Sequence, residues 1–287
     1  YHGLSNELPQ KIHHTSIKTV VTIHDLISLK FPELYPVIDR NVYRIKFKYS
    51  CEHADRIIAI SEQTKTDIVE LFEVPEEKIS VVYQDCHPRY YAEPDEEDLE
   101  RVRTKYKLPP KYLLYVGAIT PRKNVLNIVK ALHRLHDPEI SLVIIGRGSS
   151  YQKELAAYVE SHEMERQVKF LPNVPDDDLP AIYRQASTFV YPSVYEGFGI
   201  PIIEALYSRV PVITSDRGCF KEAAGPGAFY IDPADVGELV EAIKEITTTN
   251  SIRTKLIDDG YEYVQRFNPK QFAVDTMDVY KQVMKEQ

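Results

Sequence analysis

Short apolar runs rich in β-branched residues alternate with stretches of helical period along the whole chain. The runs that we predict to be strands cover residues 17–26, 55–61, 78–85, 111–119, 141–148, 167–174, 186–193, 210–216 and 228–233. The predicted helices cover residues 40–54, 61–72, 124–136, 150–162, 176–186, 236–247, 251–267 and 269–286. Because such alternation is typical of parallel sheets covered by helices on both faces, the pattern predicts an α/β protein.

An acidic, proline-containing stretch at 87–99 divides the alternation into two series. It has no hydrophobic period, which is typical of a linker. A length of 287 residues also favours two domains over one. We therefore predict a first Rossmann-like domain over 1–90, a linker over 91–108, a second Rossmann-like domain over 109–267 and a closing helix over 268–287.

Composition excludes some functions. A net charge of −8 argues against nucleic acid as the main partner. Cys51, Cys86 and Cys219 lie far apart without zinc spacing, so we expect reduced thiols, a cytoplasmic location and no obligatory metal. The aspartates at 176–178 read as helix caps rather than as metal ligands. No apolar run has the length of a membrane span, and no signal peptide opens the chain.

The segment EGFGIPIIE, residues 196–204, is the most informative motif. It places Glu196 and Glu204 where the predicted strand 186–193 gives way to a helix that begins near Pro201. Glycines let backbone approach a ligand closely, and the free N–H groups of a helix start favour phosphate. We expect Glu204 in the first helical turn. Two carboxylates beside a phosphate-binding turn suggest a ligand with hydroxyls and phosphates, such as a nucleotide sugar.

A basic loop follows another predicted strand. In YVGAITPRKNV, residues 115–125, Gly117 allows a tight turn, and Arg122 and Lys123 bring two cations to the carboxyl edge of the sheet. Arginine binds phosphate bidentately, and lysine acts as a point charge. Such a pair is often only a solvated surface loop. Because this loop and EGFGIPIIE should face the same crevice between the domains, we predict that they bind one ligand.

Several segments resemble glycosyltransferase family 4. The matching order and spacing cover roughly residues 110–235, through VGAITPRKN, LVIIGRG and FLPNVPDDDLPAIYRQASTFVYPSVYEGFGIPIIEALYSRVPVITSD. HGLSNELP, VVTIHDL and ADRIIAISEQTKTDIVELFEVPEEKISVVYQ resemble the later part of the family's N-terminal domain, and RFNPKQFAVDTMDVYKQV resembles its closing helix, which usually crosses back to that domain. The resemblance implies the GT-B fold, in which two Rossmann-like domains face a cleft. It also implies sugar transfer from a nucleoside diphosphate sugar with retention at the anomeric carbon.

The resemblance further implies roles for single residues. Glu204 would bind ribose hydroxyls, Glu196 would hold a sugar hydroxyl, and Arg122 and Lys123 would neutralise the diphosphate leaving group. Backbone N–H groups would touch the donor sugar or its phosphates at Phe198, Gly199 and Ile200. The other donor-binding positions would be Gly117, Gly146, Arg147, Asn173 and Val174, the last three by the base or ribose.

His24 ends the first predicted strand, and alone it would read as a structural histidine. The resemblance implies that it faces the donor sugar. There it would donate a hydrogen bond, or stabilise positive charge at the anomeric carbon through its backbone carbonyl. Asp25 would orient the imidazole or, as its position favours, cap the following turn. His2 would line the acceptor side.

The sequence departs from the family at its start. Family members carry an early glycine-rich loop, which these residues lack, and the first residue is Tyr1 rather than Met. We therefore interpret the N-terminal domain as incomplete and expect impaired activity. A nucleotide-sugar-binding module or inactive fragment is the alternative from another class. A glycosidase gives no reason for the Arg-Lys loop, and a phosphorylase would need a pyridoxal-bearing lysine. An epimerase is a further rival.

The ligands stay open at this level. A GDP- or UDP-linked sugar would be the donor, and a glycan or lipid-linked saccharide the acceptor. Arg40, Arg44 and Lys48 are spaced by four in the predicted helix 40–54, with aromatic residues nearby. An ordinary surface helix explains them most simply. Because the family often uses lipid-linked acceptors, peripheral contact with the inner membrane face is a hypothesis.

Overall fold

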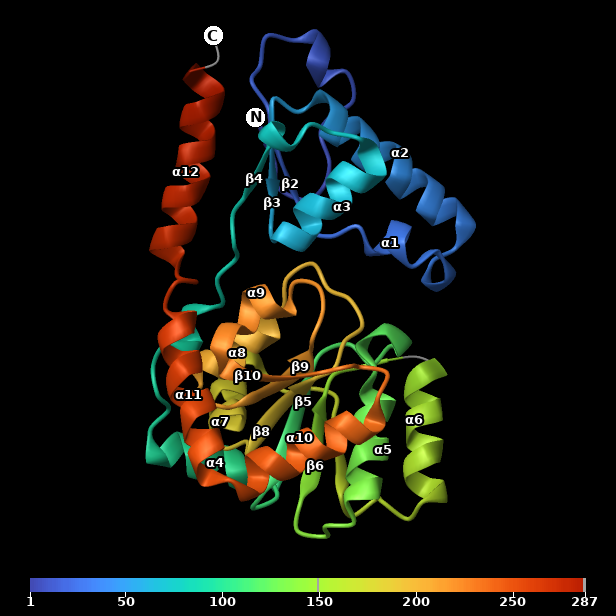
Figure 1. Ribbon diagram of the computed structural model, residues 1–287, viewed down its shortest axis with the longest axis vertical. Coiled ribbons are helices and arrows are strands. Elements are labelled where there is room, and N and C mark those ends of the chain that lie inside the picture. Colours follow the sequence, from blue (N-terminus) through green and yellow to red (C-terminus); the bar gives the residue numbers. More distant parts are fainter. Residues whose placement is uncertain (149, 286–287) are drawn as a thin grey trace. The chain divides into compact units, whose positions relative to one another are not determined.

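The computed structural model describes residues 1–148 and 150–285 (Figure 1). Its internal contacts divide the chain into two compact units. Unit 1 comprises Tyr1–Asp85, the tripeptide Glu196–Phe198 and the chain from Phe267 onward, and unit 2 comprises Cys86–Tyr195 and Gly199–Arg266. Each unit has its own parallel sheet, as the alternating pattern predicts.

Unit 1 is built on a four-stranded sheet in the order β1-β2-β3-β4. The strands are β1 (His2–Gly3), β2 (Val20–Ile23), β3 (Arg56–Ala59) and β4 (Ile79–Val81). The helices are α1 (Ile27–Lys30), α2 (Val37–His53), α3 (Glu62–Phe72) and α12 (Pro269–Lys285). The sequence pattern did not reveal β1 and α1, because elements of two and four residues are too short to show a period. Residue 286, the last of the predicted closing helix, lies outside the described residues.

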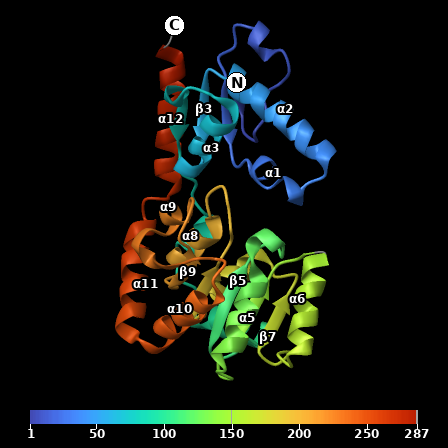
Figure 2. The same ribbon diagram turned by 45° about the vertical axis from the view of Figure 1, so that its right-hand side comes forward.

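The strands of unit 1 bury side chains on both faces, because successive residues of a strand point to opposite sides. Val21 and Ile57 belong to one core with side chains of α2 and α3. Val20 and Ile58 belong to a second core with Val279 and its neighbours in α12. The closing helix therefore packs on the sheet of unit 1, which both views of the chain show (Figures 1 and 2).

Helix α2 exposes part of its apolar surface. Phe47 and Cys51 are buried, whereas Ile38 and Ile45 are 76% and 70% exposed. Phe47 is thus part of the core of unit 1. None of the helices within residues 1–148 and 150–285 is long and apolar enough to cross a membrane.

Unit 2 is built on a six-stranded parallel sheet in the order β10-β9-β8-β5-β6-β7. The strands are β5 (Tyr112–Val116), β6 (Ser141–Ile145), β7 (Val168–Leu171), β8 (Thr188–Tyr191), β9 (Val212–Ser215) and β10 (Ala228–Ile231). All six lie within runs that the sequence predicts to be strands. Counted from the start of the unit, the order is that of a doubly wound sheet, with the first and fourth strands adjacent at its centre.

Helices cover both faces of this sheet (Figure 2). They are α4 (Glu96–Tyr106), α5 (Val125–Leu135), α6 (Ser150–Ser161), α7 (Leu179–Arg184), α8 (Ile200–Tyr207), α9 (Phe220–Ala224), α10 (Val236–Thr248) and α11 (Asn250–Val264). Helix α5 contacts α6 and α10, whereas α8 contacts α7, α9 and α11. These two groups are the layers expected from right-handed crossovers in opposite directions from the central strands.

Helix α4 occupies much of the stretch 91–108 that the sequence analysis interprets as a linker. Of its side chains only Val102 is buried, so an apolar period is hardly visible. Asp95 caps its first turn by accepting a hydrogen bond from the Asp98 N–H at 2.8 Å. The segment is therefore a helix of unit 2 that is attached mainly through polar contacts.

The interpretation of Asp176–Asp178 as helix caps is wrong for the buried member. Asp178 precedes α7 but forms no side-chain capping bond. Its carboxylate instead accepts hydrogen bonds from Arg101, Lys105 and Tyr106 of α4 at 2.8, 2.6 and 2.6 Å. Although burial opposes ionisation, these bonds lower the pKa of Asp178 to about 2. Asp178 therefore attaches α4 to the start of α7 in unit 2.

Candidate active site

The sheet order of unit 2 changes direction between β5 and β8, and ligands of open α/β sheets bind outside the carboxyl ends of strands at such a switch point. Gly117 follows β5, Gly146 follows β6, and EGFGIPIIE follows β8. The fold therefore brings the carboxyl ends that carry most of the predicted donor-binding residues to one edge.

Two glycines allow the ends of β5 and β6 to approach each other. Gly117 and Gly146 have φ of +149° and +152°, which side-chain-bearing residues rarely adopt. A Cβ atom on Gly146 would lie 1.9 Å from the Gly117 carbonyl oxygen. Only glycine fits this position without moving the backbone.

An open pocket of about 620 Å³ lies at the carboxyl ends of β5, β6 and β7. Five of the predicted donor-binding positions line it, namely Gly117, Gly146, Arg147, Asn173 and Val174. Arg147 holds one wall, because its guanidinium donates to the Asn173 side-chain oxygen and to the Pro172 carbonyl. Asp176 also lines the pocket. Its size is that of a small-molecule site.

The basic doublet lies against the loop that follows β8. Arg122 and Lys123 belong to a short 3-10 helix, Pro121–Lys123, after β5. The Arg122 guanidinium donates to the carbonyl of Tyr195, the residue before Glu196. The Lys123 ammonium donates to the hydroxyl of Tyr191 at the end of β8 and lies 4.9 Å from its ring centroid. The doublet is thus held at the switch point.

Glu204 lies deeper in helix α8 than expected. The helix begins at Ile200, so Glu204 is its fifth residue, and the prediction of a first-turn position is wrong. The Tyr183 hydroxyl donates to Glu204 Oε2 at 2.9 Å. Burial raises the pKa of Glu204 to about 7, against the opposing effect of hydrogen bonds from Tyr183 and Tyr90, and the negative charge of Asp176 adds to the rise. Glu204 is therefore within electrostatic reach of the pocket wall.

The raised pKa of Glu204 gives a stability prediction. Folding lifts this pKa from 4.5 to about 7, so the folded state binds the proton more tightly, and stability falls as the pH rises between these values. Glu204→Gln removes the ionisation. It should leave the free energy of unfolding nearly unchanged at pH 4.5 and raise it by roughly 3 kcal/mol at pH 8, at about 1.4 kcal/mol per pKa unit. Urea unfolding at both pH values checks this. A variant less stable than wild type at pH 8 would contradict it.

His24 is fixed within unit 1 by three hydrogen bonds. Its backbone N–H donates to the Asn6 side-chain oxygen at 2.7 Å. Its ring contacts the Leu4 carbonyl through Nε2 at 2.8 Å and the Gln84 amide through Nδ1 at 3.2 Å. Because a carbonyl can only accept and the Gln84 amide nitrogen donates, these partners assign the proton to Nε2. Asp25 accepts from the Ile27 N–H at 3.0 Å, which confirms its capping role.

Glu196, Gly197 and Phe198 belong to unit 1, where Gly197 lies beside His24. Glu196 is 9% exposed. The Gly197 carbonyl accepts a hydrogen bond from Ser61 Oγ at 2.6 Å, and a Cβ atom on Gly197 would lie 2.0 Å from the His24 carbonyl oxygen. The Phe198 ring stacks on Tyr83 with centroids 5.5 Å apart. Gly199, with φ +128°, is the N-cap of α8 and opens its first turn at Ile200.

Other predicted positions are held by structural contacts. His2 contacts the Tyr280 hydroxyl through Nδ1 at 2.6 Å and Thr22 Oγ1 through Nε2 at 2.8 Å, so both ring nitrogens have partners. Ser61 is the N-cap of α3, and its side chain accepts from the Thr64 N–H. In residues 1–148 and 150–285, no group of three acidic, histidine or cysteine side chains is placed to hold a metal ion.

Two parts of the site were not recognised in the sequence. Tyr183 and Tyr90 contact Glu204, yet they are buried aromatic residues that look like ordinary core positions. Asp176 lines the pocket but was interpreted as a helix cap. The position of Asp176 just after a predicted strand is the one signal that could have placed it at the carboxyl edge.

Comparison with known proteins identifies the family. The profile described as glycosyl transferases group 1 matches residues 96–263, and that of glycosyltransferase family 4 matches residues 5–84. The chain belongs to the glycosyl transferases group 1 family. Group 1 relatives include the Escherichia coli O-antigen chain mannosyltransferase B, 32% identical over 98% of this chain. The Salmonella typhimurium O-antigen chain mannosyltransferase RfbU is 32% identical over 79% of it.

The chain spans 74% of the length of the first group 1 relative and 60% of the second. Among solved structures, Anabaena HepE in complex with UDP and glucose matches 93% of this chain and 71% of its own, with a TM-score of 0.79 and 20% identity. A Rickettsia africae glycosyltransferase matches 99% of this chain and 78% of its own, with a TM-score of 0.80 and 18% identity. The GT-B fold predicted from the sequence is thereby confirmed.

Proposed function

We propose that this protein transfers a hexosyl unit from a nucleoside diphosphate sugar to a glycan or lipid-linked acceptor, with retention at the anomeric carbon. The observation that carries the proposal is the position of Arg122 and Lys123. Both cations are fixed at the switch point of the sheet, between the end of β8 and the end of β5. Gly117, which follows β5, lines the donor pocket. Retention is carried over from the family resemblance.

The chemistry follows from the charge that develops on the leaving group. Cleavage of the sugar–phosphate bond leaves negative charge on a diphosphate oxygen, and cations placed in advance stabilise it. A guanidinium has five N–H donors in a planar fork that matches phosphate oxygens, and an ammonium has three donors, so both groups are chemically suited to a diphosphate.

The other residues have proposed roles around the donor. Glu204 binds the ribose hydroxyls and Glu196 a hydroxyl of the sugar. The N–H groups at the start of α8 contact the phosphates or the sugar. For His24, the ring N–H is already bonded to the Leu4 carbonyl, which favours action through the backbone carbonyl over donation from the ring. Gly197 packs closely against that carbonyl, since a Cβ atom on Gly197 would lie 2.0 Å from the His24 oxygen.

We propose mannose as the transferred sugar and guanine as the base. The relatives at 32% identity are named mannosyltransferases. The carboxylate of Asp176 lines the pocket, and its side chain is 79% exposed. Guanine presents two adjacent N–H groups, N1–H and N2–H, which a carboxylate accepts together. Uracil presents one N–H between two carbonyl oxygens, which a carboxylate repels. Asp176 therefore favours a GDP-linked donor.

A thermal-shift panel of GDP, UDP and ADP tests this proposal, because a bound nucleotide raises the apparent stability in proportion to its affinity. We expect the largest shift with GDP. Asp176→Asn should weaken GDP by roughly 10- to 100-fold, as for loss of a bidentate base contact, and should not weaken UDP, because the repulsion of the uracil carbonyls is removed as well. Asp177→Asn is the matched control, since Asp177 is 95% exposed and does not line the pocket. No shift with any nucleotide would reject the donor site.

Turnover separates the enzyme from the alternative, a nucleotide-sugar-binding module. A protein that only binds the nucleotide sugar would show the thermal shift with GDP but would not release GDP from GDP-mannose in the presence of acceptor. Peripheral membrane contact stays a prediction. It is supported by the exposed Ile38 and Ile45 of α2 together with Arg40 and Arg44 on the same helix.

A further inference from the structure

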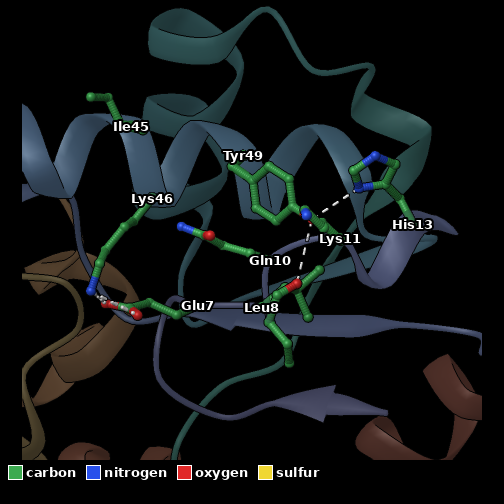
Figure 3. Close-up of a pocket in the computed structure, with 9 residues that line it drawn as sticks. Glu7, Leu8, Gln10, Lys11, His13, Ile45, Lys46 and Tyr49 are labelled. Carbon is green, nitrogen blue, oxygen red and sulfur yellow. Dashed lines mark hydrogen bonds and ion pairs between the residues drawn. The ribbon is translucent and has the colours of Figure 1, made fainter. Parts of the chain in front are cut away.

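A second pocket lies wholly within unit 1, between helix α2 and the segment 7–13 that leads from β1 toward β2 (Figure 3). Its volume of about 490 Å³ is within the range of small-molecule sites. It shares no residue with the donor pocket of unit 2. A ligand of this pocket would therefore be recognised separately from the nucleotide.

One wall of the pocket is a fixed aromatic ring. The Tyr49 hydroxyl contacts His13 Nδ1 at 2.9 Å and donates to the Pro9 carbonyl at 3.4 Å. The ring of His53 stacks on that of Tyr49, with centroids 4.4 Å apart and an interplanar angle of 27°. Contacts at the hydroxyl and on the ring hold Tyr49 in one orientation. Because the Tyr49 side chain is already immobilised, a ligand that packs on its ring loses little binding free energy to ordering it.

Polar groups with free hydrogen-bonding capacity surround this ring. Gln10 lies between Tyr49 and the ion pair of Lys46 with Glu7, whose Nζ and Oε1 are 3.0 Å apart (Figure 3). Neither the Gln10 amide nor the Lys11 ammonium has a hydrogen-bond or ion-pair partner among the described residues. The wall thus offers an amide that both donates and accepts, a carboxylate and two ammonium groups.

We propose that this pocket binds a pyranose unit of the saccharide acceptor, with its C–H face on the Tyr49 ring and its hydroxyls on Gln10 and the Glu7–Lys46 pair. The proposal rests on the proposed glycosyl transfer. A pyranose carries an apolar face of C–H bonds and a rim of hydroxyls. An aromatic ring with an amide, a carboxylate and an ammonium at its edge complements both parts.

The charge of the pocket favours a sugar over a phosphate. Lys46 is compensated by Glu7, which leaves Lys11 as the uncompensated cation of the lining. Local desolvation and the neighbouring His14 and His53 lower the pKa of His13, so its imidazole adds little charge at neutral pH. Binding of a phosphate group would need more uncompensated cationic side chains than this wall supplies.

The segment that lines the pocket also reaches the predicted reaction site of unit 1. Asn6 precedes Glu7 and accepts from the His24 N–H, and Leu4 holds the His24 ring. One short segment therefore connects the saccharide pocket with His24.

Saturation-transfer NMR with an α-linked mannobiose tests the pocket in the full chain without nucleotide. We expect transfer to the disaccharide in the wild type. Gln10→Ala should weaken binding about fivefold or more, as for one lost hydrogen bond, and Tyr49→Leu should abolish it. Tyr43→Leu is the matched control, because Tyr43 is on the same helix and does not line the pocket. Circular dichroism shows whether the Tyr49→Leu variant is folded. If that variant is unfolded, the binding measured for Gln10→Ala tests the pocket.

Kinetics distinguish this inference from the proposed function. Gln10→Ala should raise the KM for the saccharide acceptor about fivefold or more, with kcat, the KM for the donor and the GDP thermal shift unchanged. Binding of mannobiose that depends on Gln10, in a protein that binds no nucleotide, would support the pocket and reject the transfer. Failure of the wild type to bind mannobiose, or equal losses in Tyr43→Leu and Gln10→Ala, would overturn the inference.

Discussion

Replacing either cation of the Arg122–Lys123 doublet with alanine is expected to slow sugar transfer by about 100- to 1,000-fold, the usual cost of removing one group that stabilises developing negative charge, or about 2.7–4 kcal/mol. The loss should be larger in kcat than in the KM for the donor, because the charge on the diphosphate grows as the bond to the sugar breaks. Initial rates with a GDP-linked mannosyl donor and a saccharide acceptor measure both constants.

Each cation also has a structural partner, so a matched variant is needed. Lys123 donates to the Tyr191 hydroxyl, and Tyr191→Phe removes that bond while it keeps the ammonium. We expect Tyr191→Phe to cost less than tenfold, which is the scale of one ordinary hydrogen bond. Turnover of Lys123→Ala or Arg122→Ala within about threefold of wild type would reject the phosphate role. Equal losses in Tyr191→Phe and Lys123→Ala would assign the effect to loop position instead.

The sequence predicts the architecture of unit 2 because its strands are nearly continuous apolar runs. Leu113 and Leu114 in β5, and Val143 and Ile144 in β6, are fully buried. Strands buried on both faces produce such runs, and helices between them require parallel pairing. Once the strands are parallel, their carboxyl ends share one edge. That edge is why residues as far apart as Gly117 and Val174 line one pocket.

The parts that the sequence did not predict depend on contacts between distant side chains. Asp178 looks like a helix cap until α4 supplies Arg101 and Lys105, which lie more than 70 positions away. Tyr183 looks like a core residue until its hydroxyl is found on Glu204. Neither contact leaves a periodic signal, because each joins single residues of different elements. The roles of Asp178 and Tyr183 depend on tertiary contacts, whereas the hydrophobic period of the sequence predicts only the helix or strand in which a residue lies.

The donor pocket also depends on a glycine whose replacement should have a large effect on stability. Gly146→Ala is expected to destabilise unit 2 by about 3 kcal/mol or more. Its φ of +152° is a conformation that costs other residues about 1–3 kcal/mol. The added Cβ would also lie 1.9 Å from the Gly117 carbonyl oxygen, a backbone atom that cannot rotate away. Relief of this clash must separate the ends of β5 and β6, so the GDP thermal shift should also be lost.

Gly237→Ala provides the matched control for this glycine. Gly237 lies in the first turn of α10, its φ is not in the left-handed region, and its Cβ position is 3.0 Å from an Asp235 side-chain oxygen, which can adjust. Because alanine favours helix over glycine by roughly 0.5–1 kcal/mol, Gly237→Ala should be neutral or slightly stabilising. Thermal unfolding should place Gly146→Ala roughly 6–12 °C below this control, at about 2–4 °C per kcal/mol. If both variants melt together and bind GDP like wild type, the close approach of β5 and β6 at Gly146 is not needed for the donor site.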